Sequence, residues 1–460
     1  MNEDAIRNLI QSQRDFYERG ITREIPFRKS QLKNLFNLIK KYEADILEAL
    51  YVDLRKPVFE GFMSEIGIIY SELRSAKRKV KSWSRAKLVP GAWLNICAVN
   101  KILPEPRGVV LVIGPWNYPF QLLMSPLIGA IAAGNCAILK PSEFSPATSS
   151  IVSRIIKDGF DPEYIAVVEG GVEVGQSLVG QKFDHIFYTG GTEIGKKIMK
   201  GAAENLTPVT LELGGKSPCI IDESADLDLA AKKIVWGKFW NAGQTCIAPD
   251  YLLADSRIKE RLVGKITRCI ETFWGADPSK TKDYARIINE KHFQRLRNLM
   301  NSGKIVIGGK CVESERYISP TVIENTGLDS PIMKEEIFGP LLPVLEFKDI
   351  DDCIKKIKLN PKPLALYCFS KDKVFRSRIM REIPFGGGCI NDTFLQFTNH
   401  KLPFGGVGTS GFGHYHGKFT FDTFSHFKPV VRSLWVNGLW PIYPPYRFFT
   451  KLMRKLITWI

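Results

Sequence analysis

The sequence predicts an α/β protein built around a parallel β-sheet, and the evidence is a run of alternating patterns that begins after Arg107. Five short apolar runs each suit a buried strand: 109–113, 137–139, 165–168, 185–188 and 209–213. Helical patterns separate most of these runs, at 121–133, 149–157 and 193–203. Strands that alternate with helices imply βαβ units, and such units form parallel sheets. The 460 residues also exceed what one core supports, so we expect two or three domains.

Helices are predicted before this sheet, and a second mixed region is predicted after it. From residue 1 to about residue 84, apolar side chains recur at three- and four-residue intervals, which is typical of amphipathic helices. Residues 92–103 alternate loosely and predict a strand. Beyond Cys246 we expect a helix near 256–273 and a turn-rich segment at 306–319. Because no low-complexity linker separates these regions, the domains are expected to interleave along the chain.

Composition excludes several classes of protein. With 44% hydrophobic and 24% charged residues, the chain is an ordinary globular protein rather than a disordered one. Nine scattered cysteines without a CxxC pair predict neither a disulfide framework nor a zinc site, and they indicate a reducing, cytoplasmic compartment. The histidines lack metal-ligand spacing, so no metal is expected, and His414 and His416 are interpreted as surface loop residues. The amino terminus lacks the apolar region of a signal peptide.

The formal charge of +16 raises the possibility of a nucleic-acid partner. Six basic residues and no acid fall in 428–460, and the remaining positive charge is spread without a basic stripe. That is the pattern of a solvated surface, so we expect no nucleic acid to bind.

The segment 240–249 carries the first candidate for chemistry, because it places Cys246 after a Gly-Gln turn with few charges nearby. A thiol at such a turn can lie at the floor of a cavity with backbone N–H groups beside it. Those donors would favour the thiolate, which is the nucleophilic form. The alternative is a buried structural cysteine, and this segment by itself favours that alternative.

Ligands on parallel sheets bind beyond the carboxyl ends of the strands, so the residues after each apolar run are further candidates. Gly190 and Gly191 open a helix, whose exposed N–H groups suit a phosphate; the simpler interpretation is a tight strand-to-helix turn. Lys140 and Glu143 resemble a clamp for ribose hydroxyls, or else they are a solvated pair of loop charges.

Two polar residues beside these turns suit catalysis. Asn117 carries an amide donor that can stabilise an oxyanion, although asparagines in turns are commonly only turn formers. Glu212 ends an apolar strand, where a carboxylate is costly unless it is paired, solvated or functional, and we favour a function for it.

Five motifs in order connect these residues to a known family. They are Pro115-Trp116-Asn117, Lys140-Pro141-Ser142-Glu143, Leu211-Glu212-Leu213-Gly214-Gly215-Lys216, Gly243-Gln244-Thr245-Cys246 and Glu336-Ile337-Phe338-Gly339-Pro340. With them, the chain resembles the aldehyde dehydrogenase superfamily from near residue 1 to about residue 430. The short amino terminus and the ending over 415–426 resemble its class 3 branch, which includes fatty aldehyde dehydrogenases. Gly191 stands where many relatives outside that branch carry serine, which leaves only backbone for a pyrophosphate contact there.

The resemblance implies three interleaved parts and leaves a tail. A Rossmann-like NAD(P)-binding domain is expected at 1–84 and 105–212, and an α/β catalytic domain at 213–413. A small β bridging segment, which would join the subunits of a homodimer, is expected at 85–104 and 414–435. Residues 436–460 form a basic amphipathic C-terminal tail.

The resemblance also implies a reaction, the NAD(P)-dependent oxidation of medium- or long-chain, or other hydrophobic, aldehydes to carboxylic acids. Cys246 would attack the aldehyde, Asn117 and the Cys246 N–H would hold the oxyanion, and Glu212 would activate water against the thioester. NAD is expected to be preferred over NADP, because Glu143 would repel a 2′-phosphate, partly offset by Lys140. The residues expected to bind the cofactor are Trp116, Lys140, Ser142, Glu143, Gly190, Gly191, Gly195, Glu336 and Phe338.

Two alternatives to this reaction stay open at this point. One is a coenzyme-A-acylating enzyme, although Glu212 favours hydrolysis; the other is an inactive, membrane-associated structural homologue. The aldehyde itself is also open, because aliphatic, aromatic and polyene chains all suit a pocket of large apolar residues. The candidates for its lining, which are otherwise ordinary core residues, are Trp236, Phe239, Trp240 and Phe394.

The tail from Tyr446 to Ile460 predicts an amphipathic helix of about 15 residues, shorter than the roughly 20 needed to cross a bilayer. Its basic residues lie largely opposite its apolar ones, which suits an interfacial helix on anionic lipid, peripheral on the cytoplasmic face of a membrane. The alternative is a helix docked on the enzyme's own surface. The apolar face comprises Phe449, Leu452, Met453, Leu456, Ile457 and Ile460.

Overall fold

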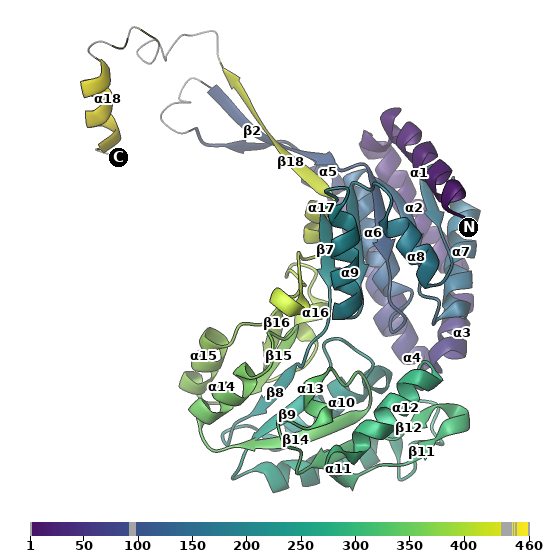
Figure 1. The fold of residues 1–460 in the computed structure, drawn as a ribbon, viewed down its shortest axis with the longest axis vertical. Helices are drawn as coiled ribbons and strands as arrows, with labels where there is room; N and C mark the ends of the chain where they lie inside the picture. The colour runs from purple at the N-terminus through teal and green to yellow at the C-terminus, as the bar shows by residue number, and fades with distance from the viewer. Residues whose placement is uncertain (1, 92–97, 434–443, 445, 447–448, 459–460) are drawn as a thin grey trace.

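The computed structural model describes residues 2–91, 98–433, 444, 446 and 449–458, and these form two sheet-centred bodies and a projecting β-ribbon (Figure 1). The first body contains a six-stranded sheet in the order β17-β7-β6-β3-β4-β5. All of its strands run parallel except β17, which is antiparallel to β7. The strands are β3 (Val109–Ile113), β4 (Cys136–Lys140), β5 (Ile165–Val167), β6 (His185–Thr189), β7 (Val209–Glu212) and β17 (Gly411–Phe412). The predicted parallel α/β sheet is therefore confirmed, with its five apolar runs as its strands.

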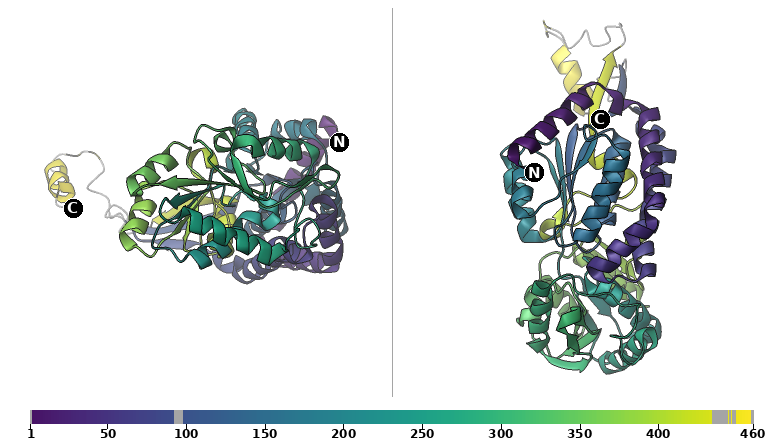
Figure 2. Two further views of the ribbon diagram at one scale, coloured as in Figure 1. Left: turned by 90° about the horizontal axis from the view of Figure 1, so that it is seen from below. Right: turned by 90° about the vertical axis from the view of Figure 1, so that its right-hand side faces the viewer.

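Helices cover both faces of this sheet (Figure 2). One layer contains α1 (Glu3–Glu18), α8 (Val172–Val179) and α9 (Thr192–Ala203). The other layer contains α2 (Ile25–Lys41), α3 (Glu43–Leu54), α5 (Gly67–Trp83), α6 (Gln121–Ala133) and α7 (Pro146–Gly159), with the short α4 (Val58–Gly61) between α3 and α5. Every residue of α6 is buried, because this helix is apolar on all sides and packs between the sheet and the N-terminal helices.

The second body contains a seven-stranded sheet in the order β10-β13-β14-β9-β8-β15-β16, parallel apart from the β10–β13 pair. Its strands are β8 (Pro218–Ile221), β9 (Tyr251–Asp255), β10 (Lys304–Ile307), β13 (Thr321–Glu324), β14 (Leu341–Phe347), β15 (Ala365–Phe369) and β16 (Gly387–Ile390). The turn-rich segment also holds the small hairpin of β11 (Cys311–Val312) and β12 (Tyr317–Ile318). The helices of this body are α10 (Leu227–Phe239), α11 (Lys259–Trp274), α12 (Glu290–Leu299), α13 (Pro331–Lys334), α14 (Ile350–Lys358), α15 (Lys373–Glu382) and α16 (Leu395–Thr398).

The β-ribbon projects away from both bodies (Figures 1 and 2). It consists of β1 (Lys87–Val89), β2 (Ala98–Pro106) and β18 (Ser425–Ser433), all antiparallel. The strand predicted at 92–103 begins at Ala98 in the structure, and residues 92–97 lie outside the described part of the chain.

The chain returns to the first body after completing the second, which corrects two of the predicted domain limits. Residues 411–412, expected in the catalytic domain, form β17 on the six-stranded sheet. The helix α17 (Lys418–Thr423), expected in the bridging segment, packs on α6. This contact is close, since a Cβ atom on Gly129 would lie only 2.2 Å from Thr420 Cγ2. The packing of β17 and α17 on the first body is a tertiary contact, which local sequence patterns do not indicate.

The predicted C-terminal helix is present as α18 (Phe449–Thr458). Residues 447–448 and 459–460 of the predicted segment lie outside the described residues. Within the described part of the chain, α18 included, no helix combines the length and the hydrophobicity that crossing a membrane requires.

Candidate active site

The turn that carries Cys246 is held in an unusual backbone conformation. Helix α10 runs into a short 3-10 turn in which Asn241 and Ala242 have φ values of 53° and 51°. The Asn241 N–H donates to the buried carboxylate of Glu60 at 2.9 Å. A Cβ atom on Gly243 would lie 2.3 Å from the Gly339 carbonyl oxygen, so the turn has room only for glycine there.

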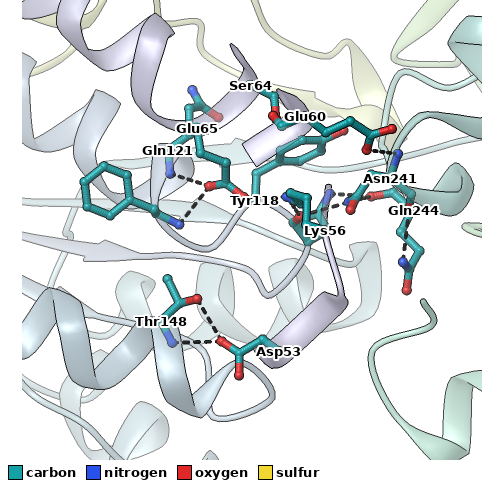
Figure 3. A network of polar contacts seen from close by, with 12 residues as sticks. Asp53, Lys56, Glu60, Ser64, Glu65, Tyr118, Gln121, Thr148, Asn241 and Gln244 are labelled. Carbon is teal, nitrogen blue, oxygen red and sulfur yellow. Dashed lines mark hydrogen bonds and ion pairs between the residues drawn. The ribbon is translucent and has the colours of Figure 1, made fainter. Parts of the chain in front are cut away.

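Asn117 is tied to the same turn by its side chain and its carbonyl group. Its Nδ2 donates to the carbonyl of Gln244 at 3.0 Å. Its own carbonyl accepts from Lys56 Nζ and from Asn241 Nδ2, each at 3.0 Å (Figure 3). Asn117 thus bonds Gln244, which lies two residues before Cys246, but Asn117 is not among the residues that line the cavity described below.

A buried ion pair that the sequence analysis missed supports this region (Figure 3). Lys56 and Glu65 pair with both side chains fully buried. Glu65 also accepts from the N–H groups of Phe120 and Gln121, where α6 begins. Since an unpaired charge in this interior would be costly, the pair fixes the N-terminal helices against the catalytic turn. Lys56 and Glu65 belong to none of the motifs, so only their contacts identify them.

One cavity of about 380 Å³ lies between the two bodies and contains both principal candidates. Glu212 and Thr189 reach it from the carboxyl edge of the six-stranded sheet, and Cys246 reaches it from the second body. Aromatic side chains make up much of the remaining wall: Phe59, Tyr118, Trp236, Trp240, Phe394, Phe397, Phe404 and Tyr415. Trp236, Trp240 and Phe394 therefore line the cavity as predicted. Phe239 does not; it is buried against Trp274 in the core of the second body.

Cys246 is half-buried at this cavity. Burial raises its pKa strongly, and the nearby carboxyl groups of Glu336 and Glu212 raise it further. The N–H groups of Cys246 and Ile247 act in the opposite direction, as the sequence analysis expected, but they are outweighed.

Glu212 lies in the same cavity without any hydrogen-bond partner. Its side chain is 1% exposed, and neither carboxylate oxygen accepts or donates a hydrogen bond among the described residues. Burial raises its pKa well above the usual value. A buried, unpaired carboxyl is an unstable arrangement for structure alone, and it is typical of a group that exchanges protons.

The residues after β4 and β6 lie at one edge of the first sheet, as predicted from the parallel strands. Lys140 Nζ bonds Glu143 Oε2 at 3.0 Å and the Pro141 carbonyl at 3.0 Å, and Ser142 is buried beside them. Lys140 and Glu143 thus form an ion pair, with the Glu143 side chain 32% exposed.

The glycines at the start of α9 leave its first turn open. Gly191 is the residue before the helix and makes no side-chain cap, and a Cβ atom placed on it would meet nothing within 4 Å. On Gly190 and Gly195, in contrast, a Cβ atom would lie 2.2 Å from Tyr188 Oη and 2.7 Å from Leu213 Cδ2. The close packing brings the helix onto the sheet, while its uncapped N–H groups face free space that suits a phosphate.

Three more cofactor candidates are Glu336, Trp116 and Phe338, of which Glu336 is near enough to Cys246 to raise the pKa of its thiol. Glu336 lies against the backbone that follows β7, since a Cβ atom on Gly214 would be 1.9 Å from its Oε2. Burial raises the pKa of Glu336 to about 8, and the Gly215 N–H and Lys216 partly counter this. The rings of Trp116 and Phe338 meet edge-on with centroids 5.2 Å apart. A glycine-opened helix, a charged clamp and an acid along one sheet edge together fit a dinucleotide.

The two C-terminal histidines differ from each other. His414 is exposed, as expected, but His416 is fully buried, so its interpretation as a surface residue is wrong. Its ring packs on Phe397, Phe404 and Tyr415, three members of the cavity wall. Local sequence gives no sign of this, because the burial comes from segments that are distant along the chain.

Comparison with known proteins decides the family. The sequence model of the aldehyde dehydrogenase family matches residues 2–430. This chain belongs to the aldehyde dehydrogenase family. It is an enzyme that oxidises aldehydes, and the expected resemblance is confirmed over the range predicted for it.

Individual members of the family are similar over nearly the whole chain. The 4,4'-diaponeurosporen-aldehyde dehydrogenase of Staphylococcus aureus is 48% identical over 430 residues, covering 93% of this chain and 94% of that protein. Aldehyde dehydrogenase family 3 member A2 of Macaca fascicularis is 44% identical over 438 residues, covering 95% and 90%. These similarities confirm the assignment to the class 3 branch.

Solved structures of aldehyde dehydrogenases agree in fold. A substrate-bound AldH of Staphylococcus aureus superposes with a TM-score of 0.96 at 46% identity, covering 98% of this chain and 99% of that one. An indole-3-acetaldehyde dehydrogenase in complex with NAD⁺ superposes with a TM-score of 0.86 at 26% identity, covering 94% and 90%. This aldehyde dehydrogenase accordingly uses a nicotinamide cofactor, NAD or NADP.

Proposed function

We propose that this aldehyde dehydrogenase converts hydrophobic aldehydes to carboxylic acids with NAD, through a thioester on Cys246 that is hydrolysed with the help of Glu212. The observation that carries the proposal is the cavity itself. It places one thiol and one unpaired carboxyl in the same apolar space, where few other groups can react.

Cys246 acts as the nucleophile. Its thiol gives up a proton as its sulfur bonds to the aldehyde carbon, and negative charge develops on the former carbonyl oxygen. The N–H groups of Cys246 and Ile247, which favour negative charge at the sulfur, would also donate to that oxygen. Asn117 uses one amide hydrogen for the Gln244 carbonyl, and an amide carries two, so the second is available to the oxyanion.

The proposed cofactor residues would hold the nicotinamide ring of NAD next to the substrate carbon. The chemistry that NAD supplies when bound is acceptance of a hydride. Lys140, Ser142 and Glu143 would hold the adenosine ribose, and the backbone at Gly190, Gly191 and Gly195 would hold the pyrophosphate. Glu336, Phe338 and Trp116 would position the nicotinamide end next to Cys246.

Glu212 acts after oxidation, as a base toward water. With both oxygens free of protein partners, its carboxyl can bind a water molecule and take a proton from it as the water attacks the thioester. The product is a carboxylic acid, which ionises when it leaves the apolar cavity. The Cys246 thiol is restored.

Glu212→Gln tests this chemistry. The glutamine cannot accept a proton, so the variant should release one equivalent of NADH per site in a burst and then stall as the thioester. Stopped-flow absorbance would follow the burst, and mass spectrometry would detect the acyl group on Cys246. Cys246→Ser, the matched control, should give no burst while retaining cofactor binding. If coenzyme A accelerates turnover of the parent enzyme and water does not accept the acyl group, the coenzyme-A-acylating alternative is correct. The proposal of thioester hydrolysis is then wrong.

The substrate class follows from the cavity wall. Trp236, Trp240 and Phe394 contact one another edge-on at centroid distances of 5.2 and 5.3 Å, and they form an apolar surface without charge. Each methylene transferred from water to such a wall contributes about 0.8 kcal/mol, or roughly fourfold in kcat/KM. We therefore expect kcat/KM to rise along a series of straight-chain aldehydes until the cavity is filled. A kcat/KM that does not change with aldehyde chain length would contradict the proposal. In the Trp236→Ala variant, kcat/KM should rise less steeply with chain length.

We also propose that the enzyme is a homodimer joined through the β-ribbon. The ribbon's outer strands β1 and β18 expose apolar side chains on a segment that projects away from both bodies. Such side chains are expected at a protein interface. They are Leu88, Val89, Phe427, Val430 and Val431.

A further inference from the structure

The proposed reaction releases protons inside a largely apolar cavity. Aldehyde, water and NAD⁺ give carboxylate, NADH and two protons, one from the thiol and one from water. Both must reach solvent before the next turnover. Since the cavity wall is mainly aromatic, any polar groups that cross this wall identify the route by which protons can leave.

Tyr415 is the innermost of these polar groups. It lines the cavity, and Glu212 and Cys246 are close enough to raise the pKa of its hydroxyl, in addition to the larger effect of burial. Glu72, from the far side of the wall, affects the same hydroxyl, and the Gln121 side chain lowers its pKa. Tyr415 therefore lies between the reacting groups and a second carboxylate that is outside the cavity.

Glu72 continues the line toward the surface. It is almost completely buried on α5 and accepts a hydrogen bond from Ser125, one helical turn beyond Gln121 on α6. Its Oε1 lies 3.5 Å from Nδ1 of His400, whose side chain is 19% exposed. Thus the outer end of the line reaches solvent.

His416 occupies the interior of this line. It is 0% exposed, and neither ring nitrogen has a hydrogen-bond partner among the described residues. Its φ of 91° is strained for a residue with a side chain. The ring lies 4.6 Å from the Tyr415 ring and 6.0 Å from the His400 ring, between centroids. An imidazole with two free nitrogens is costly in a core, so its position calls for a role beyond packing.

His416 also shares a backbone segment with Glu212. The His416 ring stacks on Phe404 at 5.2 Å with an interplanar angle of 20°. A Cβ atom on the next residue, Gly405, would lie 3.2 Å from Glu212 Oε1. Glu212 and His416 thus flank the same short segment, one on the cavity side and the other behind it.

We propose that His416, together with Glu72 and His400, forms the exit path that carries protons from Glu212 to solvent. In each transfer a proton leaves the Glu212 carboxyl and passes through Tyr415 or a bridging water to one ring nitrogen of His416. The other ring nitrogen then releases a proton through water toward His400, and bulk water finally takes it up. No electrons move, and every residue returns to its starting protonation state.

The charges around His416 suit a relay. The groups that face it are Glu72 from α5, His400 from the loop after α16, and Tyr415 beside it. Burial lowers the pKa of His416 to about 4, with Glu72 raising it and His400 lowering it, so the ring is neutral at rest. Burial opposes ionisation of Glu72, but His400, His416 and Ser125 lower its pKa overall. An ionised Glu72 stabilises the imidazolium while the proton passes.

His416→Gln removes the relay while keeping a polar side chain of similar size. Because the relay acts after hydride transfer, we expect the NADH burst to keep its rate and amplitude. Steady-state kcat should fall on the order of 10- to 10²-fold, with a larger solvent deuterium effect. Added imidazole, a small proton carrier, should restore much of the loss. His400→Gln, at the half-exposed outer end, should show the same pattern more weakly and does not depend on refolding the core.

His185→Gln is the matched control, because His185 is also buried but bonds Thr210 and lies outside the line. It should show no imidazole-dependent change in kcat. The proposal is overturned if both path variants keep the parent's kcat and isotope effect, or if their lost activity does not respond to imidazole. Failure of the thioester mechanism is distinguishable, since it would appear as a missing burst in the Glu212→Gln variant.

Discussion

Glu60 shows how one buried side chain can control the backbone of a catalytic turn. It accepts the N–H of Asn241, a residue in the left-handed region, and thereby helps to hold the turn that presents Cys246. Burial raises the pKa of Glu60 from 4.5 to about 7, although the Asn241 N–H and Lys56 lower it in part. The native enzyme therefore holds the Glu60 proton more tightly than the unfolded chain does.

The raised pKa of Glu60 makes the stability of the native enzyme depend on pH. Between pH 4.5 and about pH 7 the native state binds more protons at Glu60 than the unfolded state, so this carboxyl contributes less stability as the pH rises through that window. Glu60→Gln keeps the acceptor for Asn241 and cannot ionise. Its thermal midpoint should therefore rise relative to that of the parent as the pH increases over the window. Glu173→Gln, at an exposed carboxyl on α8, is the control; an equal difference at every pH would contradict the assignment.

Cofactor choice also depends on one residue. Glu143 can accept from a ribose 2′-hydroxyl but repels a 2′-phosphate, while Lys140, its ion-pair partner, offsets part of that repulsion. We expect NAD to be preferred in kcat/KM, with NADP tolerated. Glu143→Gln should raise the NADP/NAD ratio of kcat/KM by on the order of tenfold, which corresponds to about 1.4 kcal/mol. A parent enzyme that strongly prefers NADP would show that Glu143 does not contact the ribose.

At the scale of elements, the C-terminal helix α18 combines basic and apolar residues that suit a membrane surface. Lys451, Arg454 and Lys455 are exposed, and so is the apolar Ile457. We propose that this helix binds anionic lipid and holds the enzyme next to a source of poorly soluble aldehydes.

Removing residues 445–460 tests the role of this helix. The intact enzyme should sediment with anionic vesicles at low salt, and the truncated enzyme should stay in the supernatant with unchanged turnover of a soluble aldehyde. Lys451→Glu with Lys455→Glu, the matched variant, should weaken binding while preserving the apolar residues. Added salt should also weaken it, because surface charges are screened. Equal sedimentation of the intact and truncated enzymes would favour the alternative, a helix docked on protein.

At the scale of the whole molecule, the active site exists only because two bodies meet. The first sheet supplies Glu212 at its carboxyl edge, and the second body supplies Cys246. We propose that they are the cofactor-binding and catalytic domains, and that the β-ribbon is the bridging segment. After forming the second body, the chain returns to the first body at β17 and α17, so the domains interleave as expected.

Much of this organisation was determined by the sequence itself. Strands such as β3 and the helix α6 were predicted because their apolar runs and periods depend on neighbours only a few residues away. The motifs around Cys246 and Glu212 likewise identified the family and both principal groups, since their spacing is local and characteristic.

The tertiary structure decided what surrounds those groups. Asn117 and Gln244 meet across 127 residues of sequence, and Lys56 reaches Asn117 from the loop between α3 and α4, which no motif includes. Burial by such distant segments left Glu212 without a partner, raised the pKa of the Cys246 thiol and enclosed His416, a loop residue by its local sequence. A pKa or a cavity depends on the atoms packed around a group in space, and local sequence patterns do not encode that packing.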